Sequence, residues 1–569
     1  MSVTPEQRRR DLLGLRERWY AEGHYSSRTM ADALADAGRR VPGTRFVFAA
    51  EAGTGTETET GTGTGTGTGT DAGTTTVTLA EVLALAGRAA TGLRALGVRP
   101  GDVVAVQVPN RLELIVSYFG AWLAGAVVLP VTHIYGSAEV GVILRDAGAK
   151  VLVLPDAWRS IDFTDRLARL DGGPGLEHVV MIGDRTAPGA MPWTDLVAGT
   201  AQAALPTGVH ADDVCALIYT SGTTGVPKGV QHTHNTLLHE LRKGDLMNEA
   251  GPQDIRLIPW PSGHVAGLLA ACSGIVSGTD TVHMDRWNPV RAVELVEKYR
   301  CTITSGTPLH VEALLKAAEE SGHDISSLRF VQIGAAGVPP ALVARADAAG
   351  LVMARAYGST EHPRCATSPL DASAHQRAMT DGLARFGDEI RIVDEQLRSR
   401  PAGETGEVVT RGPSQFVGYR DPAHDDSAFL PGGWFRTGDV GRLDGDGRLT
   451  VTDRIKDIII RGGENIASKE VEDILATHPR VRHAAVVAEP DPRYGERVAA
   501  FVVLDSGTLD VEEVRELFAR HRVAPQKAPE RVEVVADLPR APSGKVRKYE
   551  LRDRLRAPAA DGPVEETGP

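Results

Sequence analysis

Short apolar runs alternate with segments of helical periodicity over most of the chain. The runs at 102–109, 150–155, 178–183, 301–306 and 328–335 are compact and bounded by Gly, Pro or charged residues, as in buried strands. Between several of them lie segments such as 289–300 and 307–320, whose apolar residues recur at helical spacing. Strands and helices in alternation predict an α/β fold, with parallel sheets covered by helices.

The pattern changes toward the C-terminus. From Glu404 the chain is rich in glycine turns, which is typical of hairpins or a small β-barrel-like subdomain. From residue 468 a compact mixture of helices and strands follows, which predicts a small α+β domain. We therefore expect an N-terminal domain at 1–455, a C-terminal domain at 456–556 and a disordered tail at 557–569.

One segment, 53–76, has a composition unlike the rest of the chain. It repeats Gly and Thr and contains no apolar residue other than Ala72. Such a segment has little to bury and cannot offset the entropy lost on ordering. It lies between two strand-like runs, so we interpret it as an expanded, disordered hairpin loop.

Composition and charge exclude several functions. The 569 residues include 62 basic and 74 acidic side chains, a net charge of −12, which argues against a general nucleic-acid binder. The 4 cysteines are widely spaced and form no zinc or disulfide pattern, which favours reduced thiols in the cytoplasm. The N-terminus has no apolar segment of a signal peptide, and the longest apolar run, 14 residues from Tyr118, is too short for a membrane span. We expect that run to be a buried helix followed by a strand.

The stretch YTSGTTGVPKGV, from Tyr219 to Val230, has the composition of a phosphate-binding loop. Its glycines and hydroxyl side chains allow backbone N–H groups to approach an oxyanion closely. The P-loop of kinases requires Lys directly after the last Gly and then a hydroxyl residue. Here Val226 and Pro227 precede Lys228, and Gly229 follows it, so the P-loop is excluded by its spacing.

Five further motifs follow this loop in a fixed order. They are YGSTE at 357–361, RTGD at 436–439, DRIKD at 453–457, RGGENI at 461–466 and PSGKVRK at 542–548. Together the six resemble the adenylate-forming superfamily of acyl-CoA synthetases, carrier-protein adenylation domains and luciferases, from about Asp32 to Arg552. GHVAG at 263–267, STEHP at 359–363 and QKAPE at 526–530 are most similar to bacterial acyl-CoA ligases. The resemblance implies a large N-terminal domain and a small, mobile C-terminal domain.

The resemblance also implies a set of site residues. The expected ATP- and AMP-binding residues are Thr220, Ser221, Gly222, Thr223, Thr224, Gly225, Lys228, Gly334, Ala335, Ala336, Tyr357, Gly358, Ser359, Thr360, Asp439 and Arg454. The expected catalytic residues are Lys545, His264 and Glu361, with Mg²⁺ at Glu361 and Thr224. Lys456 would be the hinge, and Gly462 and Gly463 would line the path of the incoming thiol. His232 and His234 need no catalytic role.

Several of these residues also have an ordinary structural explanation when each motif is considered alone. Gly462 and Gly463 equally suit a hairpin turn, and an isolated lysine in PSGKVRK is more often a solvated basic turn. His264 lacks the Phe that often precedes this position in the superfamily. Asp439 and Arg454 could form an ordinary surface salt bridge.

The function implied is ATP-dependent activation of a carboxylic acid as acyl-AMP, with release of pyrophosphate, and transfer to the thiol of CoA. Two related alternatives are loading of the phosphopantetheine of a carrier protein in trans, and activation of another oxyanion such as nitrite. A nucleotide-binding regulator without catalysis is disfavoured, because Lys545 is retained. ATP, Mg²⁺ and CoA or phosphopantetheine are the expected cofactors, and the chain is expected to be a monomer or homodimer. The identity of the acid is not readable from the sequence.

Overall fold

The computed structural model describes residues 4–50, 73–201, 205–220, 227–261, 263–334, 338–461, 464–521, 523–541 and 544–556. The chain forms two compact units. The first comprises Met1–Arg391, Val409–Thr437 and Asp444–Leu449, and the second Ile392–Val408, Gly438–Leu443 and Thr450–Pro569. The second unit thus includes two short segments that precede residue 450. The boundary expected after residue 455 stays a prediction.

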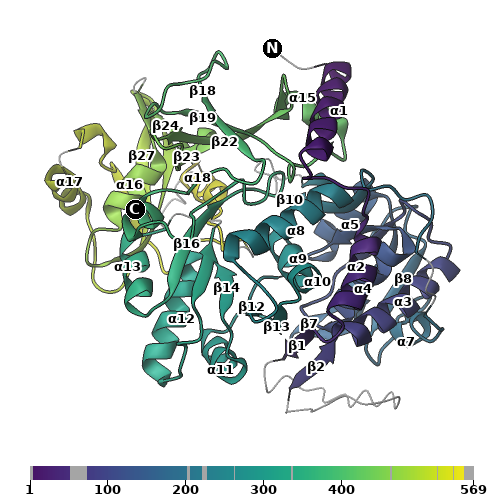
Figure 1. Ribbon diagram of the computed structural model, residues 1–569. Helices are drawn as coiled ribbons and strands as arrows, with labels where there is room; N and C mark the ends of the chain where they lie inside the picture. The colour runs from purple at the N-terminus through teal and green to yellow at the C-terminus, as the bar shows by residue number, and fades with distance from the viewer. Residues whose placement is uncertain are drawn as a thin grey trace, which may run out of the picture. The chain divides into compact units, whose positions relative to one another are not determined.

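One eight-stranded sheet of the first unit has the order β17-β16-β15-β14-β12-β13-β1-β2. Its strands are β1 (Arg45–Ala49), β2 (Thr74–Thr78), β12 (Ile255–Ile258), β13 (Asp280–Met284), β14 (Ile303–Gly306), β15 (Phe330–Ile333), β16 (Val352–Tyr357) and β17 (Ala366–Thr367). Neighbours from β1 through β16 are parallel. Helices α11 (Pro289–Tyr299), α12 (Pro308–Ser321) and α13 (Pro340–Ala348) lie against this sheet (Figure 1).

The start and end of α12 follow from local chemistry. Pro308 occupies the first turn, where its fixed φ suits a helix and no backbone N–H is needed. The helix ends at Ser321 and is capped by Gly322, whose φ of +72° is favourable for glycine. Between these ends Val311, Leu314 and Leu315 are buried in the core beneath the sheet.

The second eight-stranded sheet of this unit has the order β20-β11-β10-β4-β3-β5-β8-β9. Its strands are β3 (Val103–Val106), β4 (Val127–Pro130), β5 (Ala149–Pro155), β8 (His178–Ile182), β9 (Met191–Pro192), β10 (Val214–Thr220), β11 (Lys228–Thr233) and β20 (Gly418–Tyr419). Its helices include α3 (Leu79–Ala95), α4 (Leu112–Ala124) and α5 (Ser137–Ala147). The apolar run from Tyr118 is thus a buried helix followed by a strand, as predicted.

The remaining elements outside the C-terminal sheet form two smaller sheets and a further set of helices. A five-stranded sheet contains β18 (Glu389–Val393), β19 (Gly406–Arg411), β21 (Phe429–Leu430), β22 (Trp434–Leu443) and β23 (Leu449–Arg454), and β6 (Ala157–Trp158) pairs with β7 (Ile161–Asp162). The other helices of the first unit are α1 (Pro5–Ala21), α2 (Met30–Arg40), α6 (Phe163–Ala168), α7 (Trp193–Leu196), α8 (His234–Asn248), α9 (Val265–Cys272), α10 (Gly274–Ser277), α14 (Ala374–Met379), α15 (Asp425–Ala428) and the 3₁₀ turn η1 (Pro422–His424).

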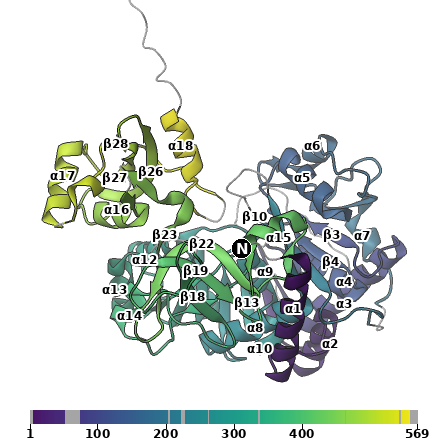
Figure 2. The same cartoon turned by 90° about the horizontal axis from the view of Figure 1, so that it is seen from above.

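The second unit is built on a sheet with the order β25-β24-β27-β26, in which β28 also pairs with β27. Its elements are η2 (Ile455–Asp457), β24 (Ile459–Arg461), β25 (Glu464–Ile466), α16 (Ser468–Leu475), β26 (Val481–Asp491), β27 (Gly495–Leu504), α17 (Val511–Arg520), η3 (Pro525–Lys527), β28 (Arg531–Val534) and α18 (Lys548–Arg556). Figure 2 shows α16, α17 and α18 around β26 and β27. Val486, Val498 and Phe518 are buried between these layers.

The predicted α/β class, with parallel sheets, a small β subdomain and a small C-terminal α+β part, is confirmed. The predicted disordered loop 53–76 needs a correction at its C-terminal end. Thr74–Thr76 begin β2, and Thr76 pairs with Val47 in an antiparallel ladder with β1. Threonine is β-branched and fits such a strand. Residues 53–72, and the predicted tail 557–569, lie outside the described residues.

All four cysteines are free and buried. None of the helices in the described part of the chain is long and apolar enough to cross a membrane.

Candidate active site

Parallel strands bring several predicted residues to one edge of the first sheet. β12, β14, β15 and β16 run in the same direction, so their carboxyl ends lie at the same edge. Gly334 follows β15, and Tyr357 ends β16. The N–H of Gly334 donates to the carbonyl of Gly306, at the end of β14, across 3.2 Å. This edge is where open α/β sheets bind their ligands.

The predicted phosphate loop begins and ends on paired strands. Thr220, the last residue of β10, is the register partner of Lys228, the first residue of β11. The loop residues Ser221, Gly222, Thr223, Thr224 and Gly225 lie outside the described residues, as do Ala335, Ala336, Gly462 and Gly463. Their expected roles therefore stay predictions.

The segment Tyr357–Glu361 forms a tight turn. A Cβ on Gly358 would lie 2.4 Å from the backbone nitrogen of Arg364 and 2.8 Å from the carbonyl oxygen of His362, so only glycine fits. The N–H of Ser359 donates to that same carbonyl across 3.1 Å. The turn thus leaves Thr360 and Glu361 in a fixed place after the strand.

His232 on β11 holds the same turn from the other sheet. Its Nε2 lies 2.8 Å from the carbonyl oxygen of Thr360, which can only accept, so Nε2 has the proton. Nδ1 lies 3.2 Å from the hydroxyl of Thr236. Burial lowers the pKa of His232 to about 4, so the ring is neutral at physiological pH. His232, which was expected to need no catalytic role, thus has a positioning role in this turn.

Glu361 and Lys228 are connected through Tyr419. The Tyr419 hydroxyl donates to Oε1 of Glu361 across 2.8 Å. The ammonium of Lys228 lies 5.3 Å from the centroid of the Tyr419 ring, within range of a cation–π interaction. The predicted metal-binding carboxylate and the predicted phosphate-binding lysine therefore share one contact residue, which the sequence analysis missed.

A buried network of charges lies behind this turn. Lys243 on α8 contacts Asp388 Oδ2 and Glu240 Oε2, each at 2.7 Å, and its side chain is 0% exposed. Nε2 of His362 lies 3.0 Å from Asp388 Oδ1, and Arg364 Nε donates to Glu240 Oε1 across 2.5 Å. Burial disfavours the charges, but the pairing outweighs it: the pKa of Lys243 is raised, and the pKa values of Asp388 and Glu240 are lowered. The residues immediately after Glu361 are thus anchored in the core.

His264 is the residue that precedes α9, and its side chain is half-buried. A Cβ on the neighbouring Gly263 would lie 2.4 Å from the Cα of Thr132, so the chain passes very close to the segment after β4. Burial, and then the nearby His264, lower the pKa of His133 to about 4. His264 therefore lies near a buried polar residue, and its expected catalytic role stays a prediction.

The second unit contains the other predicted residues. Asp439 is buried, and its Oδ1 lies 3.0 Å from Nε of Arg454, so these two predicted nucleotide-binding residues contact each other. Lys456 lies in η2 with an exposed side chain. Lys545 is also exposed, in a turn closed by hydrogen bonds from Gly544 N to Ala541 O and from Ala541 N to Lys545 O, of 2.8 and 2.7 Å.

The donor set suits magnesium bound together with a nucleotide. No group of three or more His, Cys, Asp or Glu able to hold a metal occurs among the described residues. Mg²⁺ typically uses one or two carboxylates and takes its other ligands from phosphates and water. A single carboxylate such as Glu361, held by a neutral hydroxyl, fits that requirement.

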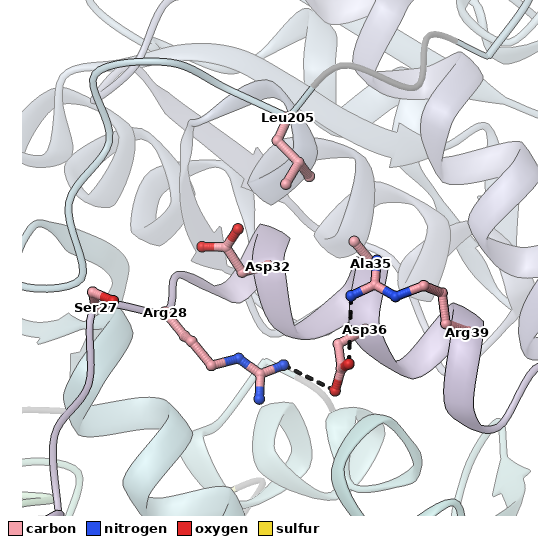
Figure 3. A pocket seen from close by; sticks show the side chains of 7 residues that line it. All are labelled: Ser27, Arg28, Asp32, Ala35, Asp36, Arg39 and Leu205. Atoms are coloured by element: carbon pink, nitrogen blue, oxygen red, sulfur yellow. Dashed lines mark hydrogen bonds and ion pairs between the residues drawn. The ribbon is translucent and has the colours of Figure 1, made fainter.

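A hollow in the first unit is lined by Ser27, Arg28, Asp32, Ala35, Asp36, Arg39 and Leu205 (Figure 3). Asp36 contacts Arg28 at 3.0 Å and Arg39 at 3.4 Å, so these charges are paired with one another. None of the predicted site residues lines this hollow.

Comparison with known proteins identifies the family. The profile of the AMP-binding enzyme family matches residues 65–420, and that of the AMP-binding enzyme C-terminal domain matches residues 470–545. The chain belongs to the AMP-binding enzyme family, and more narrowly to its AMP-forming acid–CoA ligases. The resemblance to adenylate-forming enzymes is thereby confirmed.

Relatives within the family use different acids. The chain is 36% identical over 470 residues to the medium-chain fatty-acid–CoA ligase of Escherichia coli K12, covering 81% of this chain and 83% of the relative. It is 32% identical to the 2-hydroxy-7-methoxy-5-methyl-1-naphthoate–CoA ligase of Streptomyces carzinostaticus, covering 97% and 96%. The o-succinylbenzoate CoA synthetase of Bacillus subtilis, solved with ATP and a magnesium ion, matches with a TM-score of 0.76 and 26% identity, covering 94% and 100%.

Proposed function

We propose that this chain activates a carboxylic acid with ATP and transfers the acyl group to CoA, with the predicted residues in the roles set out below. The observation that supports these roles most directly is the contact of Lys228 and Glu361 with one tyrosine. The family match over both parts of the chain supports the reaction class.

In the first step a carboxylate oxygen attacks the α-phosphorus of ATP. The bond from that phosphorus to the bridging oxygen of the β-phosphate breaks, and pyrophosphate leaves with the electron pair. Two anions must approach each other, so fixed positive charge and hydrogen-bond donors are needed where negative charge develops. Mg²⁺, held at Glu361 and Thr224, would neutralise phosphate charge.

The phosphate loop from Thr220 to Lys228 would bind the departing pyrophosphate. Thr360 would donate to the α-phosphate, and Tyr357 would lie against the adenine. Asp439 would accept hydrogen bonds from the ribose hydroxyls, with Arg454 beside it. Lys545 would supply a mobile point charge to the reacting oxygens, without a proton transfer.

In the second step the CoA thiol loses its proton to water and its sulfur attacks the acyl carbon. The thioester bond forms, the bond from that carbon to the phosphate oxygen breaks, and AMP leaves with the electron pair. Gly462 and Gly463 would leave room for the pantetheine, because a Cβ there would narrow the path. His264 would separate the acid from the arriving thiol, and Lys456 would be the hinge between the two steps.

The decisive experiment is pyrophosphate release from Mg²⁺–ATP with a panel of aliphatic, alicyclic and aromatic acids and nitrite, each with and without CoA. Sustained release that requires one class of carboxylate and CoA is expected, together with an acyl-CoA product. Release that depends on a carboxylate but stops near one turnover despite CoA would contradict CoA as the acceptor and point to a carrier protein. Turnover with nitrite and an amine, but with none of the carboxylic acids, would overturn the proposed substrate class.

A further inference from the structure

Tyr419 is held rigidly at the edge of the second sheet. It lies on β20 opposite Val230 of β11. Its carbonyl accepts from Nε2 of Gln231 across 2.8 Å, and its N–H donates to Oδ1 of Asp425 across 2.9 Å. The ring packs edge-on against Phe416 at 4.9 Å, and the residue is only 6% exposed. Tyr419 therefore has little freedom to change its rotamer.

The segment around Tyr419 holds Glu361 at two points. The Tyr419 hydroxyl donates to the carboxylate, and the N–H of Phe416 donates to the Glu361 carbonyl across 2.7 Å. The side chain and the backbone of Glu361 are thus fixed by residues three positions apart. One hydroxyl occupies Oε1, which leaves Oε2 for another ligand.

The ring of Tyr419 also contacts the ammonium group of Lys228. An aromatic face attracts an ammonium group, and here the ammonium lies 5.3 Å from the ring centroid. A tyrosine side chain has no charge of its own at neutral pH, and here its hydroxyl donates to the Glu361 carboxylate. A neutral residue that contacts both charges can set their positions without neutralising either.

We propose that Tyr419 is a positioning residue that places Glu361 and Lys228 for one Mg²⁺–polyphosphate group, the carboxylate toward the cation and the ammonium toward the phosphates. The roles of Glu361 and Lys228 in this statement rest on the proposed function. Tyr419 itself acts only through these two residues.

Tyr419→Phe in the full chain tests this assignment, because it removes the hydroxyl and keeps the ring. Calorimetric binding of ATP at increasing Mg²⁺, without acid or CoA, gives the half-saturating Mg²⁺ concentration. We expect it to rise about tenfold, the usual consequence of losing a hydrogen bond to a charged group. The affinity for AMP, which has neither β- nor γ-phosphate, should stay unchanged.

Tyr25→Phe is the matched control, because the Tyr25 hydroxyl is also buried and donates across 2.8 Å, to the carbonyl of Pro413. It should leave the Mg²⁺ requirement unchanged. The double variant Tyr419→Phe/Glu361→Gln should need no more Mg²⁺ than Glu361→Gln alone, because Tyr419 acts through that carboxylate.

An unchanged Mg²⁺ requirement in Tyr419→Phe would overturn the inference. Equal losses of affinity for AMP and for Mg²⁺–ATP would also overturn it. So would additive effects of the two substitutions in the double variant. These measurements need no acid. A chain that binds Mg²⁺–ATP but releases no pyrophosphate with any acid would defeat the proposed function and leave the Tyr419 comparison intact. Failure of the wild type to bind Mg²⁺–ATP would overturn both.

Discussion

Nζ of Lys243 lies 2.7 Å from Oδ2 of Asp388, and neither side chain is exposed to solvent. Asp388 also contacts His362 through its other oxygen at 3.0 Å. His362 directly follows Glu361, so this ion pair fixes one end of the turn that contains the predicted magnesium ligand. A buried ion pair of this kind is strongly coupled to the stability of the surrounding core.

Lys243→Met should destabilise the first unit substantially. The change leaves Asp388 and Glu240 buried without their common cation, and breaking a buried pair in this way costs about 3–5 kcal/mol. All 7 tryptophans lie in the first unit, so the fluorescence change in urea reports its free energy of unfolding.

Lys316→Met provides the control for this measurement. Lys316 and Glu320 form a 3.7 Å pair on α12 whose side chains are 67% and 68% exposed. Such surface pairs contribute at most about 1 kcal/mol, so the urea midpoint should hardly move. Equal shifts in the two variants would show that the buried network contributes no more than a surface pair.

Acidification should destabilise the first unit through His232. Its pKa is about 4 in the folded protein, below the usual value of 6.5, so the unfolded chain binds a proton first as the pH falls. Stability linked to this group is therefore complete above pH 6.5 and is lost toward pH 4, by about 3 kcal/mol. His232→Gln keeps a donor for the Thr360 carbonyl but cannot be protonated. Between pH 6.5 and pH 4 its free energy of unfolding should therefore fall by about 3 kcal/mol less than that of the wild type.

Urea unfolding at several pH values between 4 and 7 measures this effect. The quantity to compare is the change in the free energy of unfolding with pH, and not its absolute value. His375→Gln, which makes the same substitution at an exposed position on α14, is the control. Identical pH slopes for wild type and His232→Gln would contradict the assignment of a buried, neutral His232.

Residue patterns were sufficient to predict the class of fold. Apolar runs such as 102–109 and 328–335 contain β3 and β15, because a strand buried on both faces has a local signature. The motif residues of the site, such as Glu361 and Lys228, came from the resemblance to a family. That resemblance rests on the order of the motifs along the chain, which can be read directly from the sequence.

The contacts that hold these residues could not be predicted in the same way. Tyr419 and Glu361 are 58 positions apart, and Lys243 and Asp388 are 145 apart, so no periodicity connects them. The burial of His232 could not be predicted either, because a histidine on a strand is buried only if tertiary packing covers that face of the strand. Pairings of this kind are fixed by tertiary packing and not by local sequence.

Gly358→Ala should weaken nucleotide binding at least tenfold. The added Cβ would lie 2.4 Å from a backbone nitrogen, and backbone atoms cannot move aside as the end of a side chain can. Thr360 and Glu361 would then be displaced from the end of β16. Calorimetry with Mg²⁺–ATP measures the effect, with Gly14→Ala in α1, where a Cβ meets nothing within 4 Å, as the control. Full affinity in Gly358→Ala would mean that this turn does not contact the nucleotide.

Lys545→Ala should separate the two chemical steps. If the exposed ammonium of Lys545 stabilises the charge that develops during adenylation, its loss should slow pyrophosphate release by about 100-fold or more. The second step does not require that charge, so transfer from a supplied acyl-adenylate to CoA should continue near the wild-type rate. Lys469→Ala, which removes an ammonium paired with Asp473 along α16, is the control and should leave both rates unchanged. Wild-type pyrophosphate release in Lys545→Ala would show that the lysine has no part in adenylation, and equal loss of both rates would indicate damage to the whole second unit.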